Sequence, residues 1–202
     1  MNRRREYSLI VGLLVLAAVL RVWDLTRLPP GFNTDELAHI RITETIRQGH
    51  IAIHYQVGDD VGRAGLYALG NAVLVSLVGD GLLGYRMLSW AAGMVLLALV
   101  YALARRLFGL PVALIALGLS AVNLQAILLA RTVTPETLVP AYITLTLLVL
   151  ARAFNLRREV RFRLPMTLPF ALLGVLFGLS GYLHYAALPL GPIGAVFFGH
   201  LL

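Results

Sequence analysis

The first forty residues of the chain, MNRRREYSLIVGLLVLAAVLRVWDLTRLPPGFNTDELAHI (1–40), decide its fold. A basic start is followed by an apolar run long enough to cross the roughly 30 Å hydrocarbon core of a bilayer as a helix. Pro29, Pro30 and Gly31 end that helix, because proline cannot continue it and glycine permits a turn. No small-residue cleavage site follows, so the run is predicted to be a retained membrane span rather than a signal peptide.

The whole chain shares this apolar character. Its 202 residues are 59% hydrophobic and only 13% charged, with a formal charge of +7 and a mean hydropathy of +0.81. A soluble domain of this size would carry more charge on its surface. The arginines lie between apolar segments, where they set orientation in a bilayer, so the basicity does not indicate nucleic-acid binding. Cysteine is absent, which excludes disulfides and thiolate metal sites.

These features predict an all-α polytopic membrane protein with a single transmembrane domain over residues 1–202 and a cytoplasmic N-terminus. The arginine-rich segments 2–5, 104–109 and 152–163 are expected on the cytoplasmic side. Residues 64–79 reach only about 24 Å as a helix, so they are expected to lie along the outer interface. The predicted spans are about 7–27, 83–105, 110–130, 135–153, 166–184 and 186–202, and the external loop 28–82 carries juxtamembrane helices at about 35–48 and 64–79.

This topology places two adjacent carboxylates, Asp35 and Glu36, where the first span leaves the membrane. One interpretation is structural: Asn33 and Glu36 have the spacing of a capping box, and first-turn acids complement the helix dipole. The other is functional, because an ionisable group beside a membrane exit often serves a reaction. The sequence leaves both open.

Arginines are predicted on the same side of the membrane. Arg86 stands near the outer end of the second span, and Arg131 shares a short external loop with Glu136. A snorkelling arginine at a span end is the structural alternative. A carboxylate can take a proton from an acceptor hydroxyl or hold a divalent metal ion, and guanidinium groups bind phosphate. Together these residues suit a phosphate-bearing lipid substrate.

Other candidates carry weaker signals. His184 and Tyr185 are expected to line a site at the outer end of the fifth span or to anchor at the interface. Asp35 and Glu136 are the candidate metal ligands, because the spacing of the loop histidines matches no tight zinc motif. Arg21 and Asp24, three residues apart, are expected to form an ion pair.

Three segments resemble the GT-C membrane glycosyltransferases, in particular the bacterial dolichyl-phosphate-mannose protein mannosyltransferase-like group. They are LPPGFNTDELAH (28–39), GYRMLSWAAGMVLLALVYALARRLFG (84–109) and GLSGYLHYAALPLGP (178–192). The resemblance implies inverting transfer of a sugar from a polyprenyl-phosphate donor at the outer face of the cell membrane. It implies Asp35 as base or metal ligand with Glu36 in support, and a donor-phosphate site at Arg86 and Arg131.

Two alternatives remain. A shortened, non-catalytic GT-C-like subunit that packs in a larger complex is favoured by the length of the chain and by GRAGLY (62–67), where relatives carry a proline-containing motif. It predicts that the acids and arginines scatter or pair among themselves, whereas a transferase predicts that they converge. A transporter is less favoured, because no internal repeat is found and interhelical hydrogen bonds account for Asn123 and Gln125.

Overall fold

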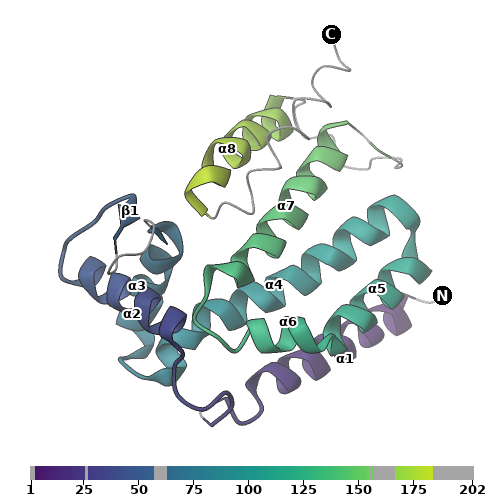
Figure 1. The fold of residues 1–202 in the computed structure, drawn as a ribbon. Coiled ribbons are helices and arrows are strands. Elements are labelled where there is room, and N and C mark those ends of the chain that lie inside the picture. Colours follow the sequence, from purple (N-terminus) through teal and green to yellow (C-terminus); the bar gives the residue numbers. More distant parts are fainter. Residues whose placement is uncertain (1–2, 26, 57–62, 155, 157–166, 184–202) are drawn as a thin grey trace.

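The computed structural model describes residues 3–25, 27–56, 63–154, 156 and 167–183 (Figure 1). Its regular elements are helices, joined by turns and loops, and two short strands that pair antiparallel. The elements are α1 (Arg3–Val22), α2 (Thr34–Arg47), β1 (His54–Tyr55), β2 (Arg63–Ala64), α3 (Leu66–Val78), α4 (Leu82–Phe108), α5 (Leu110–Val122), α6 (Leu124–Leu129), the 3-10 turn η1 (Pro135–Thr137), α7 (Leu138–Ala153) and α8 (Thr167–Leu183).

The predicted all-α membrane fold is confirmed. Among the described residues, two helical stretches are long and apolar enough to cross a membrane by length and composition: Leu82–Phe108 and Pro135–Ala153. The helices α3 and α5 and most of α8 are apolar but shorter. The expected span 186–202, together with His184 and Tyr185, lies outside the described residues. The number of crossings and their sidedness stay predictions.

The long helix α4 is the centre of the fold, and α1, α3, α5 and α7 all pack against it (Figure 1). Small side chains let these helices approach closely, as is usual for helices packed in membranes. At Gly93 of α4 an added Cβ would lie 2.9 Å from the Cβ of Ala130 and 3.6 Å from the Nε of Arg21. Gly93 is therefore required where α4 meets α1 and the end of α6.

The helices α2 and α3 form a separate layer beside the N-terminal end of α4 (Figure 1). Their contact is an apolar cluster of Ile42 and Ile46 from α2 with Ala68 and Ala72 from α3. Both helices belong to the region predicted as the external loop. The packing of α3 on α4 and of α2 on α3 holds α2 beside α4, and the carboxylates stand at the beginning of α2.

The predicted span 110–130 is broken into α5 and α6 at Asn123. Asn123 has extended backbone angles, φ −64° and ψ 117°, and its side-chain oxygen accepts a hydrogen bond from the Ala126 N–H at 2.9 Å. The carboxyl end of α5 is satisfied by Arg21, whose guanidinium donates to the carbonyls of Ser120 at 3.3 Å and Ala121 at 3.1 Å. Within a membrane span a helix can break only where other protein groups satisfy the freed backbone, and Arg21 satisfies two carbonyls at this break.

The expected ion pair between Arg21 and Asp24 is wrong. Helix α1 ends at Val22, and Asp24 takes a left-handed backbone conformation with φ 52°. The two side chains therefore do not share a helix face. Arg21 turns to the carbonyls of α5, while Asp24 lies 3.9 Å from Arg27 at the surface.

Candidate functional site

The start of α2 is fixed by the capping box that the sequence predicted. The side chain of Asn33 accepts a hydrogen bond from the Glu36 N–H at 2.8 Å, and the Glu36 carboxylate accepts one from the Asn33 N–H at 2.9 Å. This reciprocal pair satisfies two backbone donors that a helix start leaves open. The structural interpretation of Glu36 is thereby confirmed, and the orientation of Asp35 follows from it.

Glu36 also makes a contact that its neighbours in sequence could not reveal. Its second carboxylate oxygen accepts a hydrogen bond from the Val133 N–H at 2.8 Å, and the residue is only 1% exposed. A buried carboxylate requires such donors, because an unpaired buried charge is costly. Glu36 therefore joins α2 to the loop between α6 and η1.

Arg86 of α4 binds the turn that leads into α2. Its guanidinium donates hydrogen bonds to the carbonyls of Leu25 at 2.8 Å, Pro29 at 3.1 Å and Gly31 at 2.7 Å. It also lies over the ring of Phe32, 5.5 Å from the centroid. The residue is fully buried. Arg86 thus fixes the backbone just before the capping box.

Arg131 binds the same turn from the other side. It donates to the carbonyls of Leu20 at 3.2 Å, Trp23 at 2.5 Å and Leu28 at 3.1 and 3.2 Å. The last carbonyls of a helix lack intrahelical hydrogen-bond donors, and Arg131 provides such donors at the carboxyl end of α1. Arg86 interacts electrostatically with both Glu36 and Arg131, so these three charged side chains converge at the α1–α2 turn.

Asp35 points away from this buried cluster. Its side chain is 72% exposed, and one carboxylate oxygen lies 3.0 Å from the Nη2 of Arg63 on β2. The Nη1 of Arg63 lies 3.3 Å from the Nε2 of His39. Asp35 therefore stands on a solvent-facing edge with a guanidinium at its side. Sequence reasoning missed Arg63, although it stands in the GRAGLY segment just before α3.

A buried polar layer lies behind His39. The rings of His39 and Tyr67 meet edge to face at 5.7 Å, and the Tyr67 hydroxyl shares a hydrogen bond with Ser89 at 2.9 Å. Burial raises the pKa of Tyr67, so its hydroxyl stays protonated. Glu136 is exposed on η1 and acts electrostatically on Tyr67. The predicted residues thus gather at one end of the α4 layer, with Glu36 and the arginines inside and the other two acids outside.

The far end of α2 is tied to the start of α4 by a network of polar side chains. Arg47 bonds Glu44 at 2.8 Å and Asp80 at 2.6 Å, and the Tyr85 hydroxyl donates to Glu44 at 2.6 Å. The hydrogen bonds that Arg47 donates to Glu44 and Asp80 raise the pKa of Arg47, so its guanidinium stays charged. Both ends of α2 are thus fixed to the rest of the fold.

A divalent metal ion needs several oxygen or nitrogen ligands that converge on one point. In the described part of the chain, no group of three or more histidine, cysteine, aspartate or glutamate side chains could hold a metal ion. The exposed Asp35 is engaged by a guanidinium instead. Asp35 and Glu136, the predicted metal ligands, therefore belong to no such group among the described residues.

Comparison with known proteins gives one match. The sequence profile of the family described as dolichyl-phosphate-mannose-protein mannosyltransferase matches residues 66–200, about two thirds of the chain. The matched region includes Arg86, Arg131 and Glu136, and it begins after Asp35 and Arg63. No curated protein and no solved structure matches.

Proposed function

Because the chain belongs to the dolichyl-phosphate-mannose-protein mannosyltransferase family, which comprises membrane glycosyltransferases of the GT-C type, we propose that it transfers a sugar from a polyprenyl-phosphate donor to an acceptor. The transfer takes place at the outer face of the cell membrane and inverts the anomeric carbon. The protein crosses the membrane several times with its N-terminus in the cytoplasm.

One observation carries the proposal. Asp35 is an exposed carboxylate on the first turn of α2, and a buried framework fixes its backbone from several sides. Preorganisation of this kind is what a catalytic base needs, because misplaced groups lose much of their effect. Glu36 and the two buried arginines are positioning residues in this scheme.

The reaction is a single displacement. Asp35 takes the proton of the acceptor hydroxyl as the hydroxyl oxygen attacks the anomeric carbon from the face opposite the phosphate. The bond between that carbon and the phosphate oxygen breaks, and the electron pair leaves with the polyprenyl phosphate. Arg63 is the guanidinium nearest to Asp35 and stabilises the phosphate as its charge develops.

The role proposed here for Arg86 and Arg131 differs from donor-phosphate binding. Their donors are directed to backbone carbonyls of the α1–α2 turn. We therefore assign them to holding that turn and move the phosphate contact to Arg63. Glu136, exposed on η1, contributes on the acceptor side of the site.

Basic residues support the proposed orientation. Arg3, Arg4 and Arg5 begin α1, and Arg105 and Arg106 end α4. Glu6 and Arg105 form an ion pair, so these two basic helix ends lie side by side. Clustered arginines favour the cytoplasmic side, which leaves the α1–α2 turn outside.

A second candidate is a non-catalytic membrane subunit. The engagement of Arg86 and Arg131 by backbone carbonyls favours it, because a purely structural module would retain that arrangement. It predicts a stable fold with no transfer.

Transfer in isolated membranes separates the two candidates. A panel of radiolabelled polyprenyl-phosphate sugars is supplied to membranes holding the chain, its Asp35→Asn variant or its Asp24→Asn variant at matched expression. Asp35→Asn is expected to lower transfer by about 10²- to 10⁴-fold, and Asp24→Asn is expected to leave it unchanged. Equal transfer by the unchanged chain and both variants would show that Asp35 is not the catalytic base. No transfer by any of them, while a working relative transfers in the same assay, would establish the non-catalytic candidate.

A further inference from the structure

A cavity of about 410 Å³ lies between α4, α5, α6 and α7, separate from the Asp35 edge. Part of its wall is apolar, from leucines of α4, α5 and α6. Its polar lining residues are Arg21, Ser120, Asn123, Gln125 and Thr137. Such a mixed lining is typical of ligand sites, in which a few polar groups orient an otherwise apolar molecule.

Arg21 places a positive charge in this wall. It is only 1% exposed, and its donors reach the carbonyls of Ala17 at 3.2 Å, Ala121 at 3.1 Å and Ser120 at 3.3 Å. Its Nε is buried and has no hydrogen-bond partner among the described residues. Carbonyl dipoles offset part of the charge, yet no carboxylate contacts Arg21 in the described part of the chain. A buried cation in this state favours an anion beside it.

Gln125 presents a second polar group to the cavity. It is exposed within the predicted span 110–130, and its side chain makes no hydrogen bond to any described residue. An amide at membrane depth gains from a polar partner, because lipid tails offer none. The expected hydrogen bond from Gln125 to a neighbouring helix is not found among the described residues, so within this part of the chain the amide is available to a ligand.

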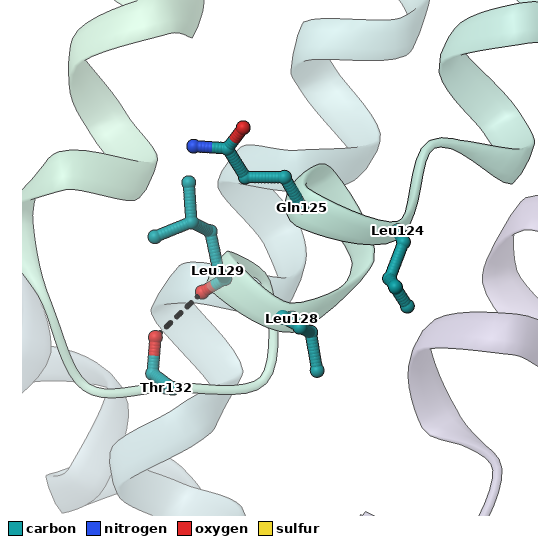
Figure 2. A pocket seen from close by; sticks show the side chains of 5 residues that line it. All are labelled: Leu124, Gln125, Leu128, Leu129 and Thr132. Carbon is teal, nitrogen blue, oxygen red and sulfur yellow. Dashed lines mark hydrogen bonds between the residues drawn. The ribbon is translucent and has the colours of Figure 1, made fainter.

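An apolar groove continues from the cavity. A hollow of about 440 Å³ shares Gln125 and Leu129 with it and is otherwise lined by Leu124, Leu128 and Thr132. Figure 2 shows Gln125 and Leu129 on one side of α6 and Leu124 and Leu128 on the other. Leu124 is 69% and Leu128 51% exposed. A charged chamber therefore opens onto a surface suited to a hydrocarbon chain.

We propose that this cavity binds an anionic glycerophospholipid. The phosphate lies against Arg21 and accepts a hydrogen bond from the Gln125 amide, and an acyl chain follows Leu124 and Leu128. The apolar groove makes the ligand a lipid rather than free phosphate, since a soluble anion gains nothing from it. The lipid closes the break between α5 and α6 and supports the end of α1 from which the α1–α2 turn begins. Its binding does not depend on catalysis at Asp35.

Binding of fluorescent phosphatidylglycerol to the purified chain in detergent tests the site. Unlabelled phosphatidylglycerol is expected to compete, and phosphatidylcholine or inorganic phosphate at equal concentration is not. Equal competition by phosphatidylcholine would show that the charge of Arg21 plays no part. Full competition by inorganic phosphate would show that a soluble anion is the ligand. Competition by a polyprenyl phosphate but not by phosphatidylglycerol would assign the cavity to a transfer donor. Each of these three results overturns the proposal.

Two substitutions at exposed positions report on the site without removing Arg21, which the fold needs. Gln125→Leu is expected to weaken binding by about threefold to tenfold, the value of one hydrogen bond, and Gln48→Leu at the end of α2 is the matched control. Leu128→Glu is expected to weaken binding at least as much, because its carboxylate repels the phosphate. Its control is Ile115→Glu, since Ile115 is exposed on α5 and does not line the groove. Wild-type binding by Gln125→Leu and Leu128→Glu would overturn the proposal.

Discussion

Glu36 accepts a hydrogen bond from the backbone N–H of Val133 at 2.8 Å, although 97 residues separate them in sequence. The same carboxylate closes the capping box with Asn33. One side chain thereby fixes the start of α2 and the loop after α6 at once. The position of Asp35, its neighbour, depends on both contacts.

Replacement of Glu36 by alanine should destabilise the fold. The loss of the cap and of the acceptor for the Val133 N–H is expected to cost about 2–4 kcal/mol in the free energy of unfolding. Glu36→Gln should cost less, since its amide keeps one acceptor oxygen. Thermal unfolding in detergent measures both, with the exposed Asp35→Asn variant as control. A Glu36→Ala protein as stable as the wild type would show that the carboxylate does not hold the two segments together.

Arg86→Lys and Arg131→Lys distinguish a positioning role from phosphate binding. A lysine keeps the charge, but its single ammonium group cannot donate to several separated carbonyls as the planar guanidinium does. We expect each variant to unfold about 1–3 kcal/mol more easily and to lose kcat in transfer because Asp35 is misplaced. Unfolding and transfer kinetics are measured on the same preparations. An unchanged stability with a raised KM for the donor would return these arginines to the phosphate site.

Arg63 should matter for transfer and little for stability. Its ion pair with Asp35 is partly exposed, so Arg63→Gln should change the free energy of unfolding by less than about 1 kcal/mol. The KM for the donor is expected to rise in Arg63→Gln. In Arg63→Lys, which keeps the charge, it should rise less. The matched control is Arg27→Gln, which removes an exposed arginine beside Asp24. Equal kinetics for Arg63→Gln and wild type would exclude a phosphate contact at this position.

Asn71 is a buried amide on α3 whose oxygen and nitrogen both lack hydrogen-bond partners among the described residues. Replacement by the similarly shaped leucine should stabilise the protein by about 1–3 kcal/mol, because the unsatisfied group disappears. Asn71→Ala should not stabilise it, since it leaves a void. Chemical unfolding of the three proteins measures the difference. A less stable Asn71→Leu protein would indicate a buried water or ligand on the amide.

The features that sequence predicted are local or depend on hydropathy. The all-α membrane fold follows from apolar runs, and the capping box follows from Asn33 and Glu36 standing three residues apart. The sequence also places Arg86 and Arg131 on the side of the acids, and in the structure both arginines lie at the turn before α2, while their predicted role in phosphate binding stays a prediction. Residue type and spacing on one element carry this information.

The partners of those arginines could not be predicted. Both stand near predicted span ends, and only the packing of α4 and α6 against α1 brings them to the carbonyls of the α1–α2 turn. The break at Asn123 is similar. An asparagine can continue a helix or cap a new one. Here Asn123 caps α6, and Arg21 of α1 stabilises this break by donating to a carbonyl of α5. Arg63 was missed because only the pairing of β1 and β2 brings it beside Asp35.

The long-range contacts at the α1–α2 turn impose an order on assembly in the cell. Arg86 and Arg131 reach the turn from positions up to 111 residues later in the chain. At ribosomal speeds of about 5–20 residues per second, the 97 residues from Glu36 to Val133 take roughly 5–20 s to synthesise. Until then one oxygen of the Glu36 carboxylate lacks the Val133 N–H, and the last carbonyls of α1 lack Arg131. The Asp35 edge is therefore completed late, after four more helices have been made, so the geometry that the proposed transfer requires forms only when the protein has packed around it.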